Sequence, residues 1–572
     1  MLLGEQQTER DDDIVVTDKK SFETSKEQPA PQKKVSKGVL SEASTTASAD
    51  DGLEDPEPFT WVDWVCWYVV SWGFLLRFQK GFLKIRMPNG VLHTFGDHRS
   101  DLQCELQVFR PRLFRRFLLG ESIGMAESYM DGDWTCEDLT SFVALVLEQD
   151  KAGVLVGLPY VKEIEIKVRS LYNYLFRAGY HFEFSLANVQ QHYDIGNDLY
   201  ERMLDPSTFS YTCALYRNPF ADQHFIAASQ FGKDMSGKNE LTHQAYKSIS
   251  LDQAQLNKIH LLIKKGNIQR HHRVLELGCG FGGFSCELAK QVGCRVDCYN
   301  LSVEQLALAR ARAKKAGVEH LINYMHDDYR ACVHYYPTKE DEVLRDGVKS
   351  ELSDRRKTGS ARNLWNQYDV IVSIGMLEHV GHNDLVVFFE TCDRMLKPGG
   401  TAVVHTITSN DFGYEHHKVT YGFIQKYIFP GACIPAVGAI VAAATGHSKF
   451  ELQHFENIGQ HYAPTLRHWR ENFYRNLDEI MALKDENTGK PKYDSKFIRM
   501  WDFYLCNCEA EFITGHFGLG QFVWKRPSSE YTDKAARDRI IPVLPSLSAL
   551  PDDEVDTYGN VVASLSGSKK TE

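Results

Sequence analysis

A glycine-rich turn, Glu276-Leu-Gly-Cys-Gly-Phe-Gly-Gly283, restricts the fold more than any other segment of the sequence. The apolar run 274–277 that leads into it predicts a buried strand, and the residues after it predict a helix. Glycines at 278, 280 and 282 allow the backbone to approach a ligand closely, where a side chain would clash. A strand, a glycine turn and a helix are typical of a nucleotide-binding crevice, but such a turn also occurs as a simple tight connection.

Further apolar segments follow the turn and alternate with helical patterns. We expect strands at 295–299, 368–374 and 401–407, and a helix over 302–316. Alternating strands and helices predict an α/β fold with a doubly wound sheet and helices on both faces.

Composition divides the rest of the chain. Residues 1–57 and 545–572 are polar and poor in aromatic side chains, so both are predicted to be disordered tails. A hairpin pattern over 82–95 and a helical pattern over 109–148 predict a small α+β domain at 81–150. The remaining divisions are a linker or bridging helix at 151–185, the catalytic α/β unit at 186–530, and within that unit a charged surface insertion at 338–363.

The Trp-rich segment, residues 58–80, shows the most abrupt change in composition. Four tryptophans share one apolar run that Asp63 interrupts: Trp61, Trp64, Trp67 and Trp72. The run is too short and too interrupted for a clear membrane span. Tryptophan favours the interface between lipid and water, so an interfacial anchor and a helix packed on the next domain are equally consistent with it.

Charge and cysteine spacing exclude several functions. A net charge of −11 argues against a nucleic-acid partner. The 13 cysteines are scattered without the paired spacing of a zinc knuckle, so no metal site is expected. Reduced, mostly buried cysteines and the absence of a secretory signal predict a cytoplasmic protein.

Three features of the α/β unit favour S-adenosylmethionine over a dinucleotide. An acidic residue precedes the first glycine of the turn by two positions. Asn300 stands at the end of the second strand, where a ribose ligand is usual, so Asn300 and Gln305 would bind the ribose hydroxyls. The segment 326–329, His-Asp-Asp-Tyr, follows where a loop that contacts adenine is expected.

Several segments resemble the cyclopropane-fatty-acid synthase family, which includes the mycolic acid cyclopropane synthases. They occur in the family's order across about 80–530, at 191–198, 203–214, 375–381, 405–409, 423–431, 462–469 and 518–522. Glu127-Ser-Tyr-Met-Asp-Gly132 is similar to part of the family's N-terminal lipid-associated domain. The Trp-rich segment and the charged insertion lie outside the family pattern.

This resemblance implies a Rossmann-like class I methyltransferase sheet that acts on unsaturated phospholipid acyl chains at a membrane surface, with S-adenosylmethionine and bicarbonate as cofactors. The implied catalytic residues, which surround bicarbonate, are Cys213, Glu378, His405, Ile407 and Tyr462. The implied cofactor-binding residues are Tyr211, Thr212, Leu277, Gly278, Cys279, Gly280, Gly282, Asn300, Gln305, Asp327 and Asp328.

The chemistry explains why such groups are needed. An isolated alkene is a poor nucleophile, so the sulfonium methyl supplies the electrophile while the protein orients and shields it. Ring closure then removes a proton from the new methyl group, which requires a base within reach. No step needs a covalent enzyme intermediate, so Cys213 is not expected to act as a nucleophile.

Other interpretations remain open from sequence alone. Glu378 could cap a helix, His405 could be a satisfied core histidine, and Cys213 could be a small buried apolar residue. The small-residue run 431–445 could line an acyl tunnel, although a close-packed helix is favoured. Alternative functions are a lipid C-methyltransferase that makes a methyl or methylene branch, and a non-catalytic lipid-binding protein. We expect peripheral membrane association and leave open the oligomeric state, with a homodimer among the options.

Overall fold

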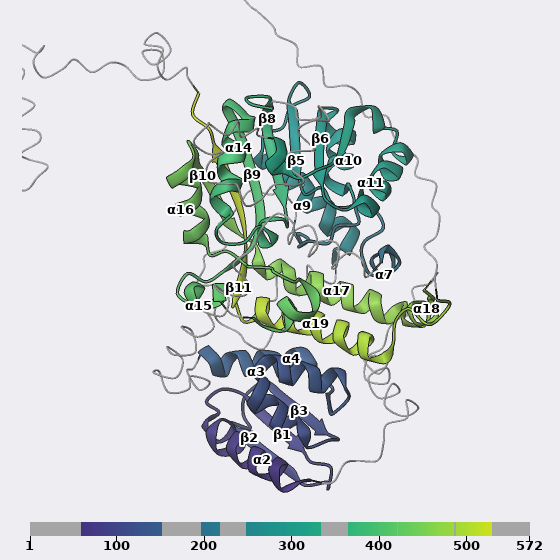
Figure 1. Ribbon diagram of the computed structural model, residues 1–572, viewed down its shortest axis with the longest axis vertical. Helices are drawn as coiled ribbons and strands as arrows, with labels where there is room; N and C mark the ends of the chain where they lie inside the picture. Colours follow the sequence, from purple (N-terminus) through teal and green to yellow (C-terminus); the bar gives the residue numbers. More distant parts are fainter. Residues whose placement is uncertain are drawn as a thin grey trace, which may run out of the picture.

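The computed structural model describes residues 59–151, 196–217, 248–332, 364–419, 421–485 and 488–528. The predicted tails, the charged insertion and nearly all of the bridging segment lie outside these residues. The described chain forms a large α/β unit and a smaller unit at the opposite end of the molecule (Figure 1).

The large unit is built on a seven-stranded sheet with the order β10-β11-β9-β8-β5-β6-β7. Its parallel strands are β5 (Arg273–Leu277), β6 (Arg295–Asn300), β7 (Ile322–His326), β8 (Tyr368–Ile374) and β9 (Leu396–Ser409). Antiparallel strands complete one edge: β11 (Phe517–Lys525) pairs with β9, and β10 (Glu451–Asn457) pairs with β11. The four strands expected from sequence are β5, β6, β8 and β9, which confirms the α/β prediction.

Helices cover both faces of this sheet because successive strand residues point to opposite sides. On one face, Leu275 packs in a cluster with side chains of α14 (Leu385–Met395) and α16 (Val437–His447). On the other face, Val274 packs with side chains of α9, α10 and α11. These helices are Leu251–Lys265, Gly283–Val292 and Val303–Lys315.

The small-residue run 431–445 contributes most of α16, where Ile440 and Ala444 are fully buried. This agrees with the interpretation of a packed helix. Helices α17 (Tyr462–Arg475) and α19 (Ser495–Ile513) pack against each other. Shorter helices are α7 (Asn197–Met203), α15 (Tyr414–Val419) and α18 (Leu477–Ala482).

The strand order places a topological switch point between β5 and β8. The chain proceeds from β5 to β6 and β7 on one side, and then returns to β8 and β9 on the other. At such a point the connections after neighbouring strands diverge and leave a crevice at the carboxyl ends of the strands, where ligands bind in open α/β sheets.

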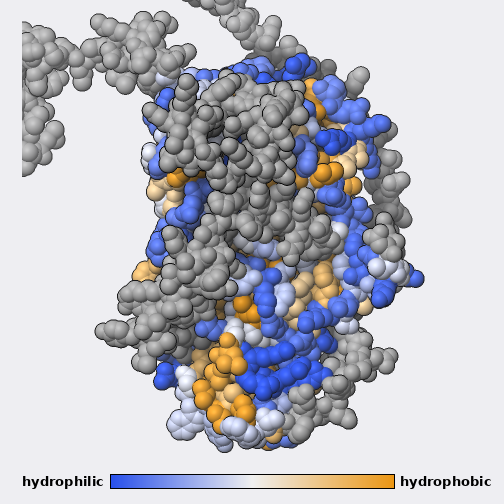
Figure 2. Space-filling model, viewed as in Figure 1, coloured by the Kyte–Doolittle hydropathy of each residue, from blue (hydrophilic) through white to orange (hydrophobic). Residues whose placement is uncertain are grey.

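The small unit holds a four-stranded sheet with the order β2-β1-β3-β4. Its strands are β1 (Phe82–Arg86), β2 (Leu92–Gly96), β3 (Gln103–Val108) and β4 (Trp134–Cys136). Strands β1 and β2 pair antiparallel, as the hairpin pattern predicted. Its helices are α2 (Trp61–Gly73), α3 (Arg112–Met130) and α4 (Leu139–Lys151), and Figure 2 shows a hydrophobic patch over the α2 end of the molecule.

The prediction of helix throughout 109–148 is wrong in two places. Trp134–Cys136 is the strand β4, which pairs antiparallel with β3 and buries Trp134. Glu121 interrupts α3 with a φ of 47°. Pairing between β3 and β4 depends on residues about 30 positions apart, and a local hydrophobic period cannot reveal it.

Helices α17 and α19 lie between the large sheet and the small unit (Figure 1). Several polar contacts join the units; among them, the Tyr129 hydroxyl donates to Asp502 at 2.9 Å, the Tyr427 hydroxyl donates to Glu127 at 2.8 Å, and Lys496 pairs with Asp131 at 2.7 Å. The block 127–132, singled out in the sequence, therefore supplies the interface between the units. None of the helices within the described ranges has the length and apolar character needed to cross a bilayer.

Candidate active site

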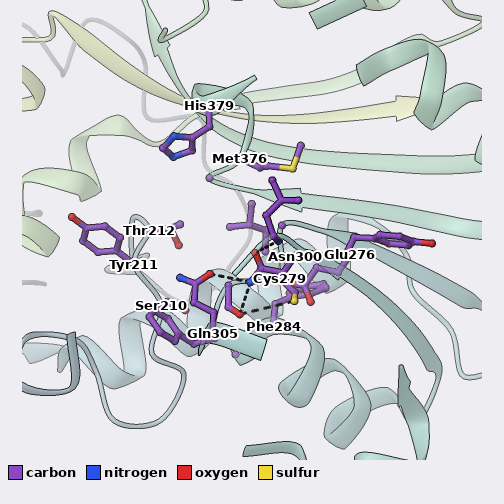
Figure 3. A pocket seen from close by; sticks show the side chains of 18 of the residues that line it. Ser210, Tyr211, Thr212, Glu276, Cys279, Phe284, Asn300, Gln305, Met376 and His379 are labelled. Carbon is purple, nitrogen blue, oxygen red and sulfur yellow. Dashed lines mark hydrogen bonds between the residues drawn. The ribbon is translucent and has the colours of Figure 1, made fainter. Parts of the chain in front are cut away.

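A pocket opens at the carboxyl ends of β5, β6 and β8, at the switch point. Segments 208–212 and 429–431 close its sides. The lining includes nine of the eleven predicted cofactor residues: Tyr211, Thr212, Gly278, Cys279, Gly280, Asn300, Gln305, Asp327 and Asp328. Figure 3 shows Asn300 and Gln305 beside Cys279, with Tyr211 and Thr212 to the left of them. Most of the cofactor residues predicted from the sequence thus line one continuous pocket.

The three glycines of the turn serve different purposes. Each has positive φ, at 77° for Gly278, 49° for Gly280 and 76° for Gly282. Gly278 and Gly280 line the pocket, and a Cβ at Gly278 would lie 3.0 Å from the side chain of Met376. Gly282 does not line the pocket. A Cβ there would instead lie 2.8 Å from Ala309 of α11. The expectation that all three glycines approach the ligand is therefore corrected for Gly282, which permits close packing of α10 on α11.

Leu277 also lies outside the pocket lining. Its side chain is fully buried beneath the turn at the end of β5. The Leu277 side chain packs in the core, and the backbone of Leu277 continues directly into the pocket-lining residue Gly278.

Asn300 and Gln305 form a hydrogen-bonded amide pair. The Asn300 Nδ2 group donates to Gln305 Oε1 at 2.9 Å and to the Gly280 carbonyl at 3.2 Å. Asn300 Oδ1 accepts from the Leu301 backbone at 2.8 Å. The pair is neutral and nearly buried, and it ties the end of β6 to the glycine turn and to the start of α11. Such amides can exchange these bonds for bonds to sugar hydroxyls.

Asp327 and Asp328 follow β7 at the edge of the pocket. The Asp328 carboxylate is occupied by Arg330, which donates to its two oxygens at 3.0 and 2.9 Å. Asp327 accepts from the Asp328 backbone at 2.9 Å. The ion pair between Asp328 and Arg330 fixes the conformation of this loop. The Asp328 side chain therefore stabilises the edge of the pocket.

Two buried ionisable residues, Glu276 and Lys258, line the pocket. Burial raises the pKa of Glu276 to about 8, and burial lowers the pKa of Lys258 to about 8. Lys258 donates to Thr212 Oγ1 at 2.8 Å and to Gln255 Oε1 at 2.7 Å. Lys258 therefore positions Thr212. Sequence reasoning missed this residue, because a lysine on an amphipathic helix is usually solvated.

The other end of the pocket is less polar. Its lining there includes Met376, His379 and Phe429, and the rings of His379 and Phe429 lie 5.2 Å apart. Burial lowers the pKa of His379 to about 4, so its imidazole is neutral at physiological pH. His379 projects beyond Met376 in Figure 3, away from the Asn300–Gln305 pair.

Glu378 lies between these lining residues in the chain but points behind the pocket wall. It belongs to the short 3₁₀ turn Leu377–His379, where its Oε1 accepts from the Ile407 backbone at 2.6 Å. Its Oε2 is buried without a partner among the described residues. Burial raises the pKa of Glu378 to about 7, which backbone hydrogen bonding partly offsets. The helix-cap interpretation is wrong, since the carboxylate reaches across to strand β9.

Tyr462 and Cys213 lie close to this carboxylate. Burial raises the pKa of Tyr462, and the neighbouring Cys213 and Glu378 raise it further. Cys213 is fully buried, and its thiol donates to the Ala214 carbonyl at 3.3 Å. Burial also raises the pKa of Cys213, which keeps the thiol protonated and unsuited to nucleophilic attack.

His405 is held by a chain of hydrogen bonds across the β9–β11 pair. Lys265 donates to Gln521 Oε1 at 2.7 Å, which leaves the Gln521 amide nitrogen to donate to His405 Nδ1 at 3.1 Å. Burial lowers the pKa of His405 far below its usual range, so the ring is neutral. With Nδ1 accepting, the ring proton resides on Nε2.

His405 Nε2 is buried without a partner among the described residues, so His405 is not a fully satisfied core histidine. In the sequence, Gln521 belongs to the segment 518–522 that resembles the family, and no local pattern indicates a role for it. The pairing of Gln521 with His405 across the antiparallel ladder gives it one.

Three of the other predicted catalytic residues therefore lie around the Glu378 carboxylate: Ile407 donates to it, Tyr462 neighbours it, and Cys213 neighbours Tyr462. His405 lies on β9, on the same side of the strand as Ile407, because the two are two positions apart. All five lie outside the pocket lining itself, directly behind it: Cys213 follows Thr212, and Glu378 lies between Met376 and His379.

Comparison with known proteins accounts for this arrangement. The family described as mycolic acid cyclopropane synthetase matches residues 182–344 and 342–522. The chain is 30% identical over 444 residues to the cyclopropane-fatty-acyl-phospholipid synthase of Escherichia coli, with 77% of this chain and 93% of that enzyme covered. It is 29% identical to a tuberculostearic acid methyltransferase of Mycobacterium tuberculosis, with 78% and 89% covered.

A more distant relative is the sphingolipid C9-methyltransferase of Candida albicans, at 25% identity with 60% of this chain and 55% of that enzyme covered. The family match spans the sheet, the glycine turn and the residues around Glu378. The chain therefore belongs to the mycolic acid cyclopropane synthetase family and is an S-adenosylmethionine-dependent methyltransferase.

Proposed function

We propose that the chain is a cyclopropane fatty acid synthase. It transfers the methyl group of S-adenosylmethionine to the double bond of an unsaturated phospholipid acyl chain and closes a cyclopropane ring after loss of a proton. The observation that carries the proposal is that two buried polar atoms behind the cofactor pocket, Glu378 Oε2 and His405 Nε2, have no hydrogen-bond partner in the described part of the chain. Buried polar atoms without partners are rare, and they suit a site built for a small polar ligand.

Bicarbonate fits this donor and acceptor set. His405 Nε2–H and the Tyr462 hydroxyl can donate to oxygens of an anion, and Glu378 Oε2 can accept from a hydroxyl of the same ion. Bound there, bicarbonate supplies a base for the proton that ring closure releases. Glu378 has its other oxygen fixed by the Ile407 backbone, so its free oxygen is held in one direction.

The remaining residues orient and protect the reacting groups. Lys258 fixes Thr212 at the cofactor side, and the apolar end of the pocket around Met376 and Phe429 excludes water from the cation that methyl transfer leaves on the acyl chain. The Tyr211 ring lies 5.1 Å from Trp469, and aromatic faces of this kind stabilise a nearby cation.

The test is a product analysis. The purified chain is incubated with S-adenosylmethionine carrying a labelled methyl group and with vesicles of an unsaturated phospholipid. We expect labelled acyl chains heavier by one CH₂ group that resist catalytic hydrogenation. An unlabelled lipid fraction would refute the proposed function.

The resemblance to a tuberculostearic acid methyltransferase supports a second candidate, a lipid C-methyltransferase. A methylene-branched product has the same added mass but takes up hydrogen. A methyl-branched saturated product is separated from a cyclopropane by chromatography against standards. Either result would replace ring closure with branching while retaining the methyl transfer.

A further inference from the structure

Helix α2 is apolar on both sides. Its inner side packs on the small unit, where Trp67 is 4% exposed and lies 4.7 Å from the Phe114 ring and 5.0 Å from the His93 ring. Its only charged residue, Asp63, is also buried and forms a capping box with Thr60. The packing interpretation of the Trp-rich segment is therefore correct for one side of the helix.

The outer side of α2 presents large apolar side chains to solvent. They recur at helical spacing, and the row continues into Leu76: Trp61, Trp64, Val65, Tyr68, Val69 and Trp72. Trp61 and Trp72, at the two ends of the helix, are 78% and 71% exposed. We call this outer row the α2 face; it stands at the end of the molecule where Figure 2 shows a hydrophobic patch. It carries no charged side chain.

The neighbouring part of α3 extends the α2 face. The Phe74 ring at the end of α2 lies 5.9 Å from Phe117, and the next two residues of α3, Leu118 and Leu119, are 38% and 83% exposed. The exposed cation Arg77 follows α2, in the turn Leu75–Arg77, and the exposed cation Arg115 stands on α3 one turn before Leu119. An apolar face with arginines at its edge is complementary to a surface that is anionic outside and apolar beneath.

We infer that the α2 face docks on the surface of an anionic phospholipid bilayer. Tryptophan and tyrosine rings are amphipathic and favour the level of the lipid head groups, and arginines beside them pair with anionic head groups. The inference rests on the proposed function, whose substrate is a membrane lipid. It concerns a different part of the molecule, about as far from the sheet as the small unit allows (Figure 1).

The occupant is a bilayer, because the α2 face offers hydrogen-bonding groups only on its aromatic rings. Interfaces between proteins usually surround an apolar centre with a polar rim that is hydrogen-bonded to the partner. Beside the α2 face stand the exposed arginines Arg77 and Arg115, which suit anionic lipid head groups.

The experiment measures binding of the full chain to vesicles without S-adenosylmethionine. Vesicles of phosphatidylglycerol with phosphatidylethanolamine are compared with vesicles of phosphatidylcholine alone by co-sedimentation. We expect the wild type to bind the anionic vesicles, and the double variant Trp61→Ser with Trp72→Ser to bind them at least about tenfold more weakly. Arg77→Glu with Arg115→Glu should weaken binding to anionic vesicles alone.

Trp365→Ser is the matched control, because Trp365 is an exposed tryptophan, at 46%, on the large unit. We expect it to bind vesicles like the wild type. Equal binding by the Trp61/Trp72 double variant and the wild type would overturn the inference. So would light scattering that shows a wild-type dimer converted to a monomer by the same double variant, since the α2 face would then be a subunit contact.

Activity separates this inference from the proposed function. The double variant should methylate phospholipid dispersed in detergent micelles to within about twofold of the wild type, and lose activity on vesicles. If the wild type binds vesicles but forms no lipid product, the proposed function fails and the docking inference stands. Loss of activity by the double variant on micelles as well would show damage to the fold and would contradict the assignment to docking.

Discussion

The two sides of the pocket differ in how their polar groups are satisfied. On the cofactor side, Asn300 bonds to Gln305 and Asp328 pairs with Arg330. On the far side, Glu378 Oε2 and His405 Nε2 have no partner among the described residues. A satisfied pair can exchange bonds with a ligand at little cost, whereas an unpaired buried group costs stability until a ligand meets it. The first side can therefore release a ligand at little cost, whereas the second would be stabilised by the small ion that we propose.

The largest expected effect comes from removing the far-side carboxylate. Glu378→Gln keeps the bond from the Ile407 backbone but loses the charge, and we expect ring formation to fall by at least about 100-fold. The affinity for S-adenosylmethionine, measured by calorimetry, should change by less than about threefold, because Glu378 is outside the pocket lining.

Glu511→Gln is the matched control. Burial raises the pKa of Glu511 to about 7, the same value as for Glu378, but Glu511 lies on α19 and accepts from Asn507 at 3.0 Å. Its variant should retain activity. Full activity in Glu378→Gln would remove this carboxylate from the mechanism.

Breaking the cofactor side should affect binding first. Gly278→Ala adds a Cβ at a φ of 77° and 3.0 Å from Met376, so we expect S-adenosylmethionine to bind about tenfold more weakly. Gly446→Ala, in α16, is the control because nothing lies within 4 Å of its added Cβ. Unchanged cofactor affinity in Gly278→Ala would mean that the turn does not contact the cofactor.

The His405 tautomer sharpens the comparison further. Gln521→Glu replaces the amide donor with an acceptor, so His405 should carry its proton on Nδ1 and lose the Nε2 donor. We expect about a tenfold loss of kcat with the S-adenosylmethionine affinity unchanged. The tautomer is read from nitrogen NMR of labelled histidine, and a retained Nε2 proton together with lost activity would contradict a positioning role.

The smallest effect is on stability. Burial raises the pKa of Glu378 from 4.5 to about 7, so the folded state binds this proton more tightly than the unfolded state. The stabilising contribution of the protonated group is complete below pH 4.5 and is lost as the pH rises through about 7. Glu378→Gln should therefore gain thermal stability relative to the wild type between these pH values. A difference in melting temperature between Glu378→Gln and the wild type that stays constant across that range would contradict the raised pKa of the buried carboxylate.

Much of the large unit could be predicted from sequence because its signals are local. The runs that became β5, β6, β8 and β9 are short and apolar, and the glycine turn carries its own geometry. Sequence reasoning was less successful where contacts join distant segments. Strand β4 depends on β3, and Gln521 acquires its role from its position opposite His405 in the β9–β11 ladder.

The candidate catalytic residues could be identified from a family resemblance. The burial and hydrogen bonding of each group could not. Burial of Lys258 and the unpaired Glu378 oxygen arise only when several segments converge. Likewise, the Trp-rich segment permitted two interpretations in sequence: the packing interpretation describes the inner side of the helix, and the interfacial interpretation is our inference for its outer side.

The tie between Tyr427 and Glu127 has a mechanical consequence. Tyr427 belongs to the turn Ile424–Ile428, and only Ile428 separates it from Phe429, which forms part of the pocket wall. A tilt of the small unit would therefore shift that wall, because only two peptide bonds join Tyr427 to Phe429. Removal of the small unit would abolish this hydrogen bond, so the large unit on its own would lose one support of its pocket wall.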